Sequence, residues 1–99
     1  MRRSTVRKQQ TPEGLVAVTF TVPVTHAARR ACLISSCTAW TELAMHPRAD
    51  GGFELIVELP PGTRHVFRYW LDDDRWENDP DADEEVVNPY GSTDSVVTT

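Results

Sequence analysis

The sequence lacks any apolar run that approaches the roughly 20 residues needed by a membrane-spanning helix. Its first ten residues are basic, but no apolar stretch follows them, so a secretory signal peptide is not predicted. Cysteine is scarce: only Cys32 and Cys37 occur, and on one extended strand they would lie about 16 Å apart, too far for a disulfide. A turn between them would shorten this distance. We interpret both as free thiols, which are typical of a reducing compartment, and expect a cytoplasmic protein.

The motifs of the common enzyme classes are also missing. The chain contains no Gly-x-Ser-x-Gly motif, no phosphate-binding loop and no catalytic Cys–His pattern. A glycosidase needs two carboxylates at a set separation inside a cleft, whereas nearly all acidic residues here lie in charged runs. We therefore expect a protein that is not an enzyme and has no catalytic residues.

Standard metal-binding patterns are absent as well. The spacing of Cys32, Cys37 and His46 matches no zinc site, so two buried small residues and a surface histidine are the simpler interpretation. The acidic stretch 79–90 imitates the first half of a calcium loop, but it lacks the glycine and the final glutamate of that loop. The sequence thus predicts neither a metal ion nor a cofactor.

Basic charge is concentrated at the start of the chain, although the net charge is −5. Residues 72–85 hold nine acidic side chains and one arginine. A protein that binds duplex nucleic acid shows a basic face over its folded part, and this pattern is absent. We therefore expect neither nucleic acid nor a membrane as a partner. The polar residues 1–13 predict a disordered basic tail, followed by a single domain over residues 14–99.

What the sequence does contain is a series of short alternating segments. Residues 16–22 place valine and phenylalanine on one face and alanine and threonine on the other, and residues 53–59 alternate in a similar way, as half-buried strands do. Residues 40–45 fit either a helical turn or a short edge strand around Met45. Further strands are expected over residues 31–35, 66–71, 75–78, 85–87 and 95–98.

Turn residues separate these segments. The run Pro60-Pro61-Gly62 forces a turn, and the three aspartates of residues 72–74 predict a tight hairpin with an aspartate at positive φ. No long amphipathic helix and no internal repeat interrupts the series. About seven short antiparallel strands in a chain of this length predict an all-β fold, specifically an immunoglobulin-like β-sandwich.

Two tryptophans stand in unusually polar surroundings. Trp76 follows the aspartate turn and is flanked by charge, while Trp40 follows the polar residues 35–39. A large apolar ring at the surface is a natural platform for a flat apolar ligand face, so the two residues indicate a binding surface. The alternatives are that Trp40 closes one end of the core and that Trp76 is structural.

The order of these segments resembles the family 48 carbohydrate-binding modules. This family includes the early-set domain at the front of isoamylases and branching enzymes, and the glycogen-binding domain of the AMP-activated kinase β subunit. The resemblance covers about residues 16–97 and rests on the strand leading to Trp40 and on the segments FELIVELPPG, HVFRYWLDD, RWENDP and NPYGSTDSVV. It implies an early-set immunoglobulin-like sandwich that binds α-1,4-linked glucans such as glycogen, starch or maltooligosaccharides.

The resemblance also implies a carbohydrate-binding site. A glucose ring packs its C–H groups on an aromatic face and offers its hydroxyls to donors and acceptors at the edge. Arg68 has a structural alternative, since it could pair across strands with Glu77 or Glu54. The implied site consists of two platforms, Trp40 and Trp76, a basic residue, Arg68, a ring-supporting residue, Tyr90, and two polar loop residues, Ser92 and Asp94.

The chain departs from the family pattern around the first platform and the last loop. Ser35, Cys37 and Thr38 stand where the family usually has glycine, an aromatic residue and asparagine; Asp73 replaces a hairpin glycine, and Asp94 replaces an asparagine. A second function therefore stays open: a docking module that kept the sandwich, lost its affinity for sugar and binds a separate enzyme or kinase subunit.

Overall fold

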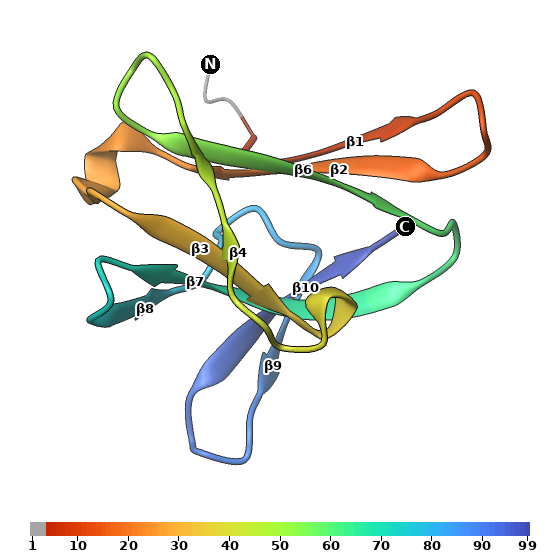
Figure 1. The fold of residues 1–99 in the computed structure, drawn as a ribbon. Helices are drawn as coiled ribbons and strands as arrows, with labels where there is room; N and C mark the ends of the chain where they lie inside the picture. Colours follow the sequence, from red (N-terminus) through yellow and green to blue (C-terminus); the bar gives the residue numbers. More distant parts are fainter. Residues whose placement is uncertain (1–3) are drawn as a thin grey trace.

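The computed structural model describes residues 4–99, which form two antiparallel sheets without an α-helix in that range (Figure 1). The four-stranded sheet has the order β1 (Val6–Gln10), β2 (Val16–Val22), β6 (Phe53–Leu59) and β5 (His46–Pro47). The six-stranded sheet has the order β4 (Leu43–Ala44), β3 (Ala31–Ser35), β7 (Arg64–Leu71), β10 (Thr93–Thr98) and β9 (Glu84–Val87), and β8 (Arg75–Glu77) also pairs with β7. Within these residues, no helix has the length and apolar character needed to cross a membrane. The all-β prediction is confirmed.

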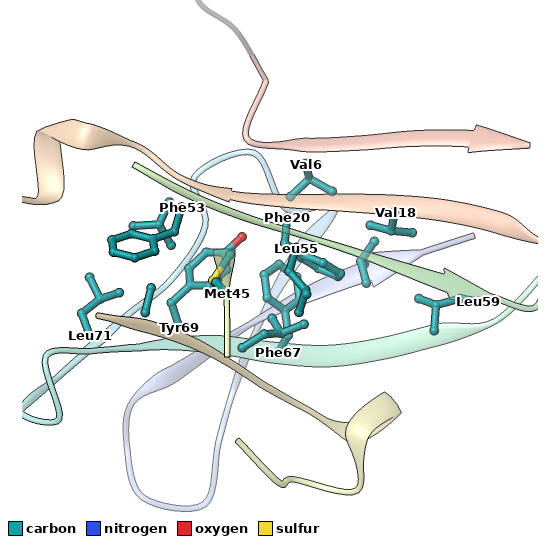
Figure 2. Close-up of a cluster of buried hydrophobic side chains, with 14 of the residues drawn as sticks. Val6, Val18, Phe20, Met45, Phe53, Leu55, Leu59, Phe67, Tyr69 and Leu71 are labelled. Atoms are coloured by element: carbon teal, nitrogen blue, oxygen red, sulfur yellow. The ribbon is translucent and has the colours of Figure 1, made fainter. Parts of the chain in front are cut away.

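The core lies between the two sheets and draws side chains from both (Figure 2). Phe20 of β2 and Phe67 of β7 are fully buried and meet edge to face, with ring centroids 5.0 Å apart. Tyr69 continues the row, its ring centroid 5.7 Å from that of Phe67. Aromatic pairs in this geometry stabilise a core beyond the area that they bury. Two sheets that face each other across one apolar layer have the layout of a β-sandwich.

The strands with a buried face agree closely with the sequence prediction. β2, β3 and β6 span the predicted residues, while β7 and β10 each begin two residues earlier than expected. In β2, Val18 and Phe20 are buried and the intervening Thr19 is only half-buried, which is the expected period of two. The alternation of apolar and polar residues therefore fixes which face of these strands meets the core.

The prediction of a disordered tail over residues 1–13 is wrong for the part that the structure describes. β1 pairs with β2 in antiparallel register, and Val6 is buried against the core. The Lys8 ammonium lies 2.7 Å from a carboxylate oxygen of Asp83, which fixes the outer side of the strand. The sequence of β1 carries a single apolar residue, so the strand depends on its backbone pairing with β2 and on these side-chain contacts. Residues 1–3 lie outside the described part of the chain.

Residues 43–47 form a short crossing between the two sheets. β4 pairs with β3 of one sheet and β5 pairs with β6 of the other, so the edge strand rather than the helical turn is present here. The side chain of Met45 is buried between these two strands, and its N–H donates to Ala31 O at 2.9 Å. The ten strands of the described chain exceed the expected seven because β1 is additional and this edge is divided.

The aspartate hairpin between β7 and β8 follows the prediction. Asp72 and Asp73 have φ values of 55° and 58°, the left-handed backbone of the two central residues of a type I′ turn. The Asp74 N–H donates to Leu71 O at 3.1 Å and closes the turn. The carboxylate of Asp72 accepts the backbone N–H groups of Arg30 and Arg29, and these bonds lower its pKa below the usual value. The turn is thereby tied to the segment that enters β3.

Candidate functional site

The site begins with an unusual division of one edge of β7. β10 pairs with the first half of this edge, ending at Phe67, and β8 pairs with the second half, starting at Tyr69. Arg68 lies at the point where one partner strand replaces the other. Because Phe67 and Tyr69 are buried in the core, alternation turns Arg68 and Trp70 to the outer face of the six-stranded sheet. Side chains from β8 and β10 can therefore meet Arg68 on the same face.

Trp76 occupies this outer face directly opposite Trp70. The centroids of the two rings are 4.5 Å apart, with a tilt of 47° between the ring planes. The guanidinium carbon of Arg68 lies 4.8 Å from the centroid of the Trp76 ring, a cation–π distance. Trp76 remains 44% exposed, so neighbouring side chains orient the ring and leave part of it open to solvent.

The charge of Arg68 is balanced within the site. Its Nε lies 3.5 Å from Oδ1 of Asp94 on β10, and both side chains are mostly buried. This Nε is itself buried and makes no hydrogen bond of good geometry. The side-chain amide of Asn88 donates to the same oxygen of Asp94 over 3.4 Å. The partner of Arg68 is thus Asp94, rather than either of the glutamates that the sequence had suggested.

Trp40 reaches the site from the loop that follows β3. This loop contains a single 3₁₀ turn, η2 (Ser36–Thr38), and Trp40 comes two residues after it. The Trp40 N–H donates to Ser35 O at 2.9 Å, while the side chain is 55% exposed. A ring that closed one end of the core would be buried, so the alternative of a structural plug does not hold for Trp40.

The hairpin loop between β9 and β10 supplies the third aromatic residue. The side-chain carbonyl of Asn88 accepts the backbone N–H groups of Tyr90 (2.9 Å) and Ser92 (3.2 Å), which holds the loop in a compact turn. Tyr90 is 93% exposed at the tip. This hairpin projects away from the two layers in Figure 1. It therefore presents Tyr90 at the rim of the site instead of in its floor.

These segments enclose one hollow, which we call the tryptophan groove. Its volume is about 300 Å³. Five of the six predicted residues line it; the sixth, Ser92, does not, but its hydroxyl lies 3.3 Å from the side-chain amide of Asn88. The lining consists of Ile34, Trp40, Arg68, Trp76, Asn88, Pro89, Tyr90 and Asp94.

Sequence reasoning missed three of the lining residues. Ile34 pairs with Arg68 in the register of β3 and β7, so a register drawn from the sequence would have placed it beside the arginine. Asn88 and Pro89 carry a turn signal, because asparagine before proline favours the start of a turn. Apart from the resemblance, which groups the neighbouring Tyr90 with the tryptophans, no sequence signal indicates that this turn folds toward them. That placement depends on the pairing of β10 with β7.

The groove offers apolar ring faces with polar groups at their edges. The guanidinium of Arg68 can only donate hydrogen bonds, and the carboxylate of Asp94 can only accept them while ionised. Cys32 and Cys37 are free thiols, and in residues 4–99 no three histidine, cysteine or acidic side chains gather closely enough to hold a metal ion. The arrangement thus suits a neutral ligand with flat apolar faces and hydroxyl groups.

A larger hollow, of about 480 Å³, lies elsewhere on the surface, between the start of β1 and the 3₁₀ turn η1 (Val24–His26). It contains no tryptophan, and charged groups of both signs line it. No family model and no curated protein sequence matches this chain. The chemistry of the tryptophan groove is therefore the main indication of function.

Proposed function

We propose that this chain is a non-catalytic module that binds α-glucans of the glycogen or starch type, built on an immunoglobulin-like, early-set variant of the sandwich. One observation carries the proposal: Trp40 and Trp76 come from different segments, yet both are exposed and line one groove on the same sheet. The resemblance to family 48 carbohydrate-binding modules assigns the platform role to these same two residues. A cytoplasmic storage polymer fits the pair of free thiols.

The chemistry of the groove suits a chain of glucose units. Each aromatic platform can cover the C–H face of one ring, while Arg68 donates to hydroxyl oxygens and Asp94 accepts from hydroxyl groups. Stacking of flat ligands on aromatic side chains is worth about 1–3 kcal/mol per contact. After the cost of ordering the ligand, two or three such contacts give weak binding, on the order of micromolar to millimolar.

Docking on a separate enzyme or kinase subunit is the second candidate, and the position of Tyr90 favours it. Tyrosine, tryptophan and arginine dominate the energetics of protein interfaces, and the groove contains all three types. A tyrosine that is 93% exposed on a projecting hairpin can reach a protein surface as well as a sugar. The two functions differ in one measurable property, which is retardation by a glucan in the absence of any other protein.

Affinity electrophoresis in native gels with and without glycogen tests the proposal. We expect glycogen to retard the wild-type chain and to retard Trp76→Ala and Trp40→Ala much less, because each variant lacks one platform. Ile56→Ala is the matched control, since Ile56 is 60% exposed but lies on β6 of the other sheet. Near-ultraviolet circular dichroism checks that each variant is folded.

Titration with β-cyclodextrin, followed by tryptophan fluorescence, gives the affinity of each chain. Removal of one platform should weaken binding by about 5-fold to 150-fold, which corresponds to the loss of about 1–3 kcal/mol. Equal mobility of the wild-type chain with and without glycogen, together with no fluorescence change, would reject glucan binding and leave docking. Equal retardation of wild type and both tryptophan variants would show that glucan binds outside the groove.

A further inference from the structure

The backbone at Trp40 has an unusual conformation for a large side chain. Ala39 and Trp40 have φ values of 54° and 63°, so two consecutive residues other than glycine are left-handed. Each such residue costs roughly 1–2 kcal/mol relative to the right-handed conformation. This conformation persists only where the surroundings hold it in place. The question is which groups hold Trp40 and what they achieve.

The hydroxyl of Thr38 lies at the centre of the bonds that define this loop. The Thr38 Oγ1 accepts the N–H of Ser35 at 3.3 Å and lies within donating distance of two carbonyl oxygens, that of Ser35 (2.9 Å) and that of Thr41 (3.0 Å). The hydroxyl of Thr41 donates in return to Thr38 O at 2.6 Å. Residues on both sides of Trp40 are thus tied to one side chain.

The same loop is also anchored to β7, the strand that carries Arg68. Ser35 Oγ donates to Val66 O at 2.8 Å, and Ser36 Oγ accepts the Val66 N–H at 3.0 Å. Val66 belongs to β7, two residues before Arg68. The loop that carries Trp40 and the strand that carries Arg68 therefore form one hydrogen-bonded unit, which fixes the position of Trp40 relative to the rest of the groove.

We propose that Thr38 is a positioning residue, whose hydroxyl fixes the left-handed turn and thereby sets the Trp40 ring over the tryptophan groove before ligand arrives. The inference rests on the proposed function, because a preset ring has value only if it meets a ligand. Ordering a mobile loop and its side chains on binding costs free energy, about 0.5–1.5 kcal/mol for each immobilised side chain. A backbone that is already fixed at Trp40 reduces this cost, so the hydroxyl of Thr38 acts on affinity without touching the ligand.

The test compares Thr38→Val, which removes the hydroxyl at nearly constant shape, with Thr38→Ser, which keeps it. All chains carry 5-fluorotryptophan, and Trp40→Phe assigns the fluorine resonance of Trp40 among the three tryptophans. We expect Thr38→Val to shift or broaden the Trp40 resonance alone and to weaken β-cyclodextrin binding by about fivefold. Thr38→Ser should resemble wild type in both measurements. Thr41→Val, which removes the reciprocal bond, is a second variant in case Thr38→Val does not fold.

The outcomes separate this inference from the proposed function. If wild type binds and Thr38→Val binds equally well, the positioning role is overturned while glucan binding stands. An unchanged Trp40 resonance in Thr38→Val, or equal losses in Thr38→Val and Thr38→Ser, also overturns it, because the hydroxyl then does not set the ring. If wild type itself does not bind, the proposed function is rejected, and the fluorine spectra alone decide whether Thr38 holds Trp40.

Discussion

At the scale of single residues, the ion pair between Arg68 and Asp94 both stabilises the fold and orients the ring of Trp76. Arg68 is held by a carboxylate from another strand and at the same time packs on the ring of Trp76. Both charged side chains are mostly buried, so each depends on the other to offset the loss of solvent. The contact therefore has a structural effect that is measurable without any ligand.

We expect Arg68→Met to lower the free energy of unfolding by about 2 kcal/mol, because Asp94 would keep a mostly buried charge without its counter-ion. Arg68→Lys should cost about 1 kcal/mol, since lysine keeps the charge but loses the flat group over Trp76. Urea unfolding of both variants, of Asp94→Asn and of the double variant Arg68→Met/Asp94→Asn measures the coupling. Strictly additive effects in this cycle would show that the pair contributes nothing jointly.

The same pair shows where sequence reasoning stops at this scale. The apolar pattern of β7 fixes the orientation of every second residue, so the sequence is sufficient to put Arg68 on the face opposite the buried Phe67 and Tyr69. The expected partners of Arg68, Glu77 or Glu54, were wrong, because the sequence did not indicate which strand would bring a carboxylate to it. Along one edge of β7, β10 pairs up to Phe67 and β8 pairs from Tyr69 onward, and this arrangement brings Asp94 of β10 next to Arg68. That arrangement depends on contacts between residues far apart in the sequence.

At the scale of elements, strands with a continuous buried face were predictable and edge strands were not. β6 alternates along its whole length, and its predicted bounds are the observed ones. β1 has one buried residue followed by four exposed ones, a pattern that a solvated tail also shows. It becomes a strand because the open edge of β2 offers backbone partners, and a sequence window around β1 does not contain that edge.

The edge strand β1 gives a prediction that a disordered tail would not. Val6→Asp should lower the free energy of unfolding by about 2–3 kcal/mol, because a carboxylate would be buried against the core without a partner. Gln9→Asp is the matched control, since it places the same new charge on an exposed position of the same strand. Urea unfolding of both variants tests this, and equal stabilities would mean that β1 does not form in solution.

At the scale of the whole molecule, a buried polar network joins distant segments to the core. Asp79, in the loop after β8, is 2% exposed and accepts the hydroxyl groups of Tyr69, at 2.6 Å, and of Thr5. The Asp79 N–H donates to Ser95 Oγ at 2.9 Å. The residue before β1, the centre of β7 and the strand β10 therefore meet at one residue, Asp79, the first two at its carboxylate and β10 at its backbone N–H. This network holds β10 in position. From there Asp94, and Tyr90 in the hairpin loop between β9 and β10, reach the groove.

Five of the six predicted site residues line the groove. The order of the segments along the chain indicated this grouping, although the shapes of single loops could not be predicted. Trp76 follows from a strand with a recognisable pattern, so its place on the sheet was within reach of sequence reasoning, whereas Asp94 was expected in a loop and lies on β10. The loop of Trp40 departs from the family pattern at three positions, and its shape was not predictable. Hydrogen bonds from Ser35 and Thr38 hold that loop, and no periodic pattern in a sequence reports such bonds.

The buried network also determines how the molecule responds to alkaline pH. Burial, reinforced by the neighbouring carboxylate of Asp79, raises the pKa of Tyr69 well above its ordinary value of 10.0. The folded state therefore favours the neutral phenol, and this contribution to stability is complete below the pKa of the unfolded chain. As pH rises beyond about 10, the unfolded chain loses the proton first and the stability falls. Burial also raises the pKa of Cys32 from 9.0. Ionisation of this thiol in the unfolded chain therefore adds a second loss of stability, which begins at a lower pH than the loss from Tyr69.

We expect the urea midpoint of unfolding to decrease as the pH is raised from 8 to 11. A parent variant in which other groups that titrate in this range are replaced isolates the part of this decrease that Tyr69 causes. Cys32→Ala removes the thiol, and Lys8→Arg keeps the only lysine position charged over this range. In that background Tyr69→Phe should be less stable at pH 8, because Asp79 loses a donor, and should show a much smaller alkaline fall. Tyr90→Phe should keep the full alkaline fall, since that side chain is exposed. The same alkaline fall in Tyr69→Phe and its parent would mean that Tyr69 is accessible and that the Asp79 network does not close the molecule in solution.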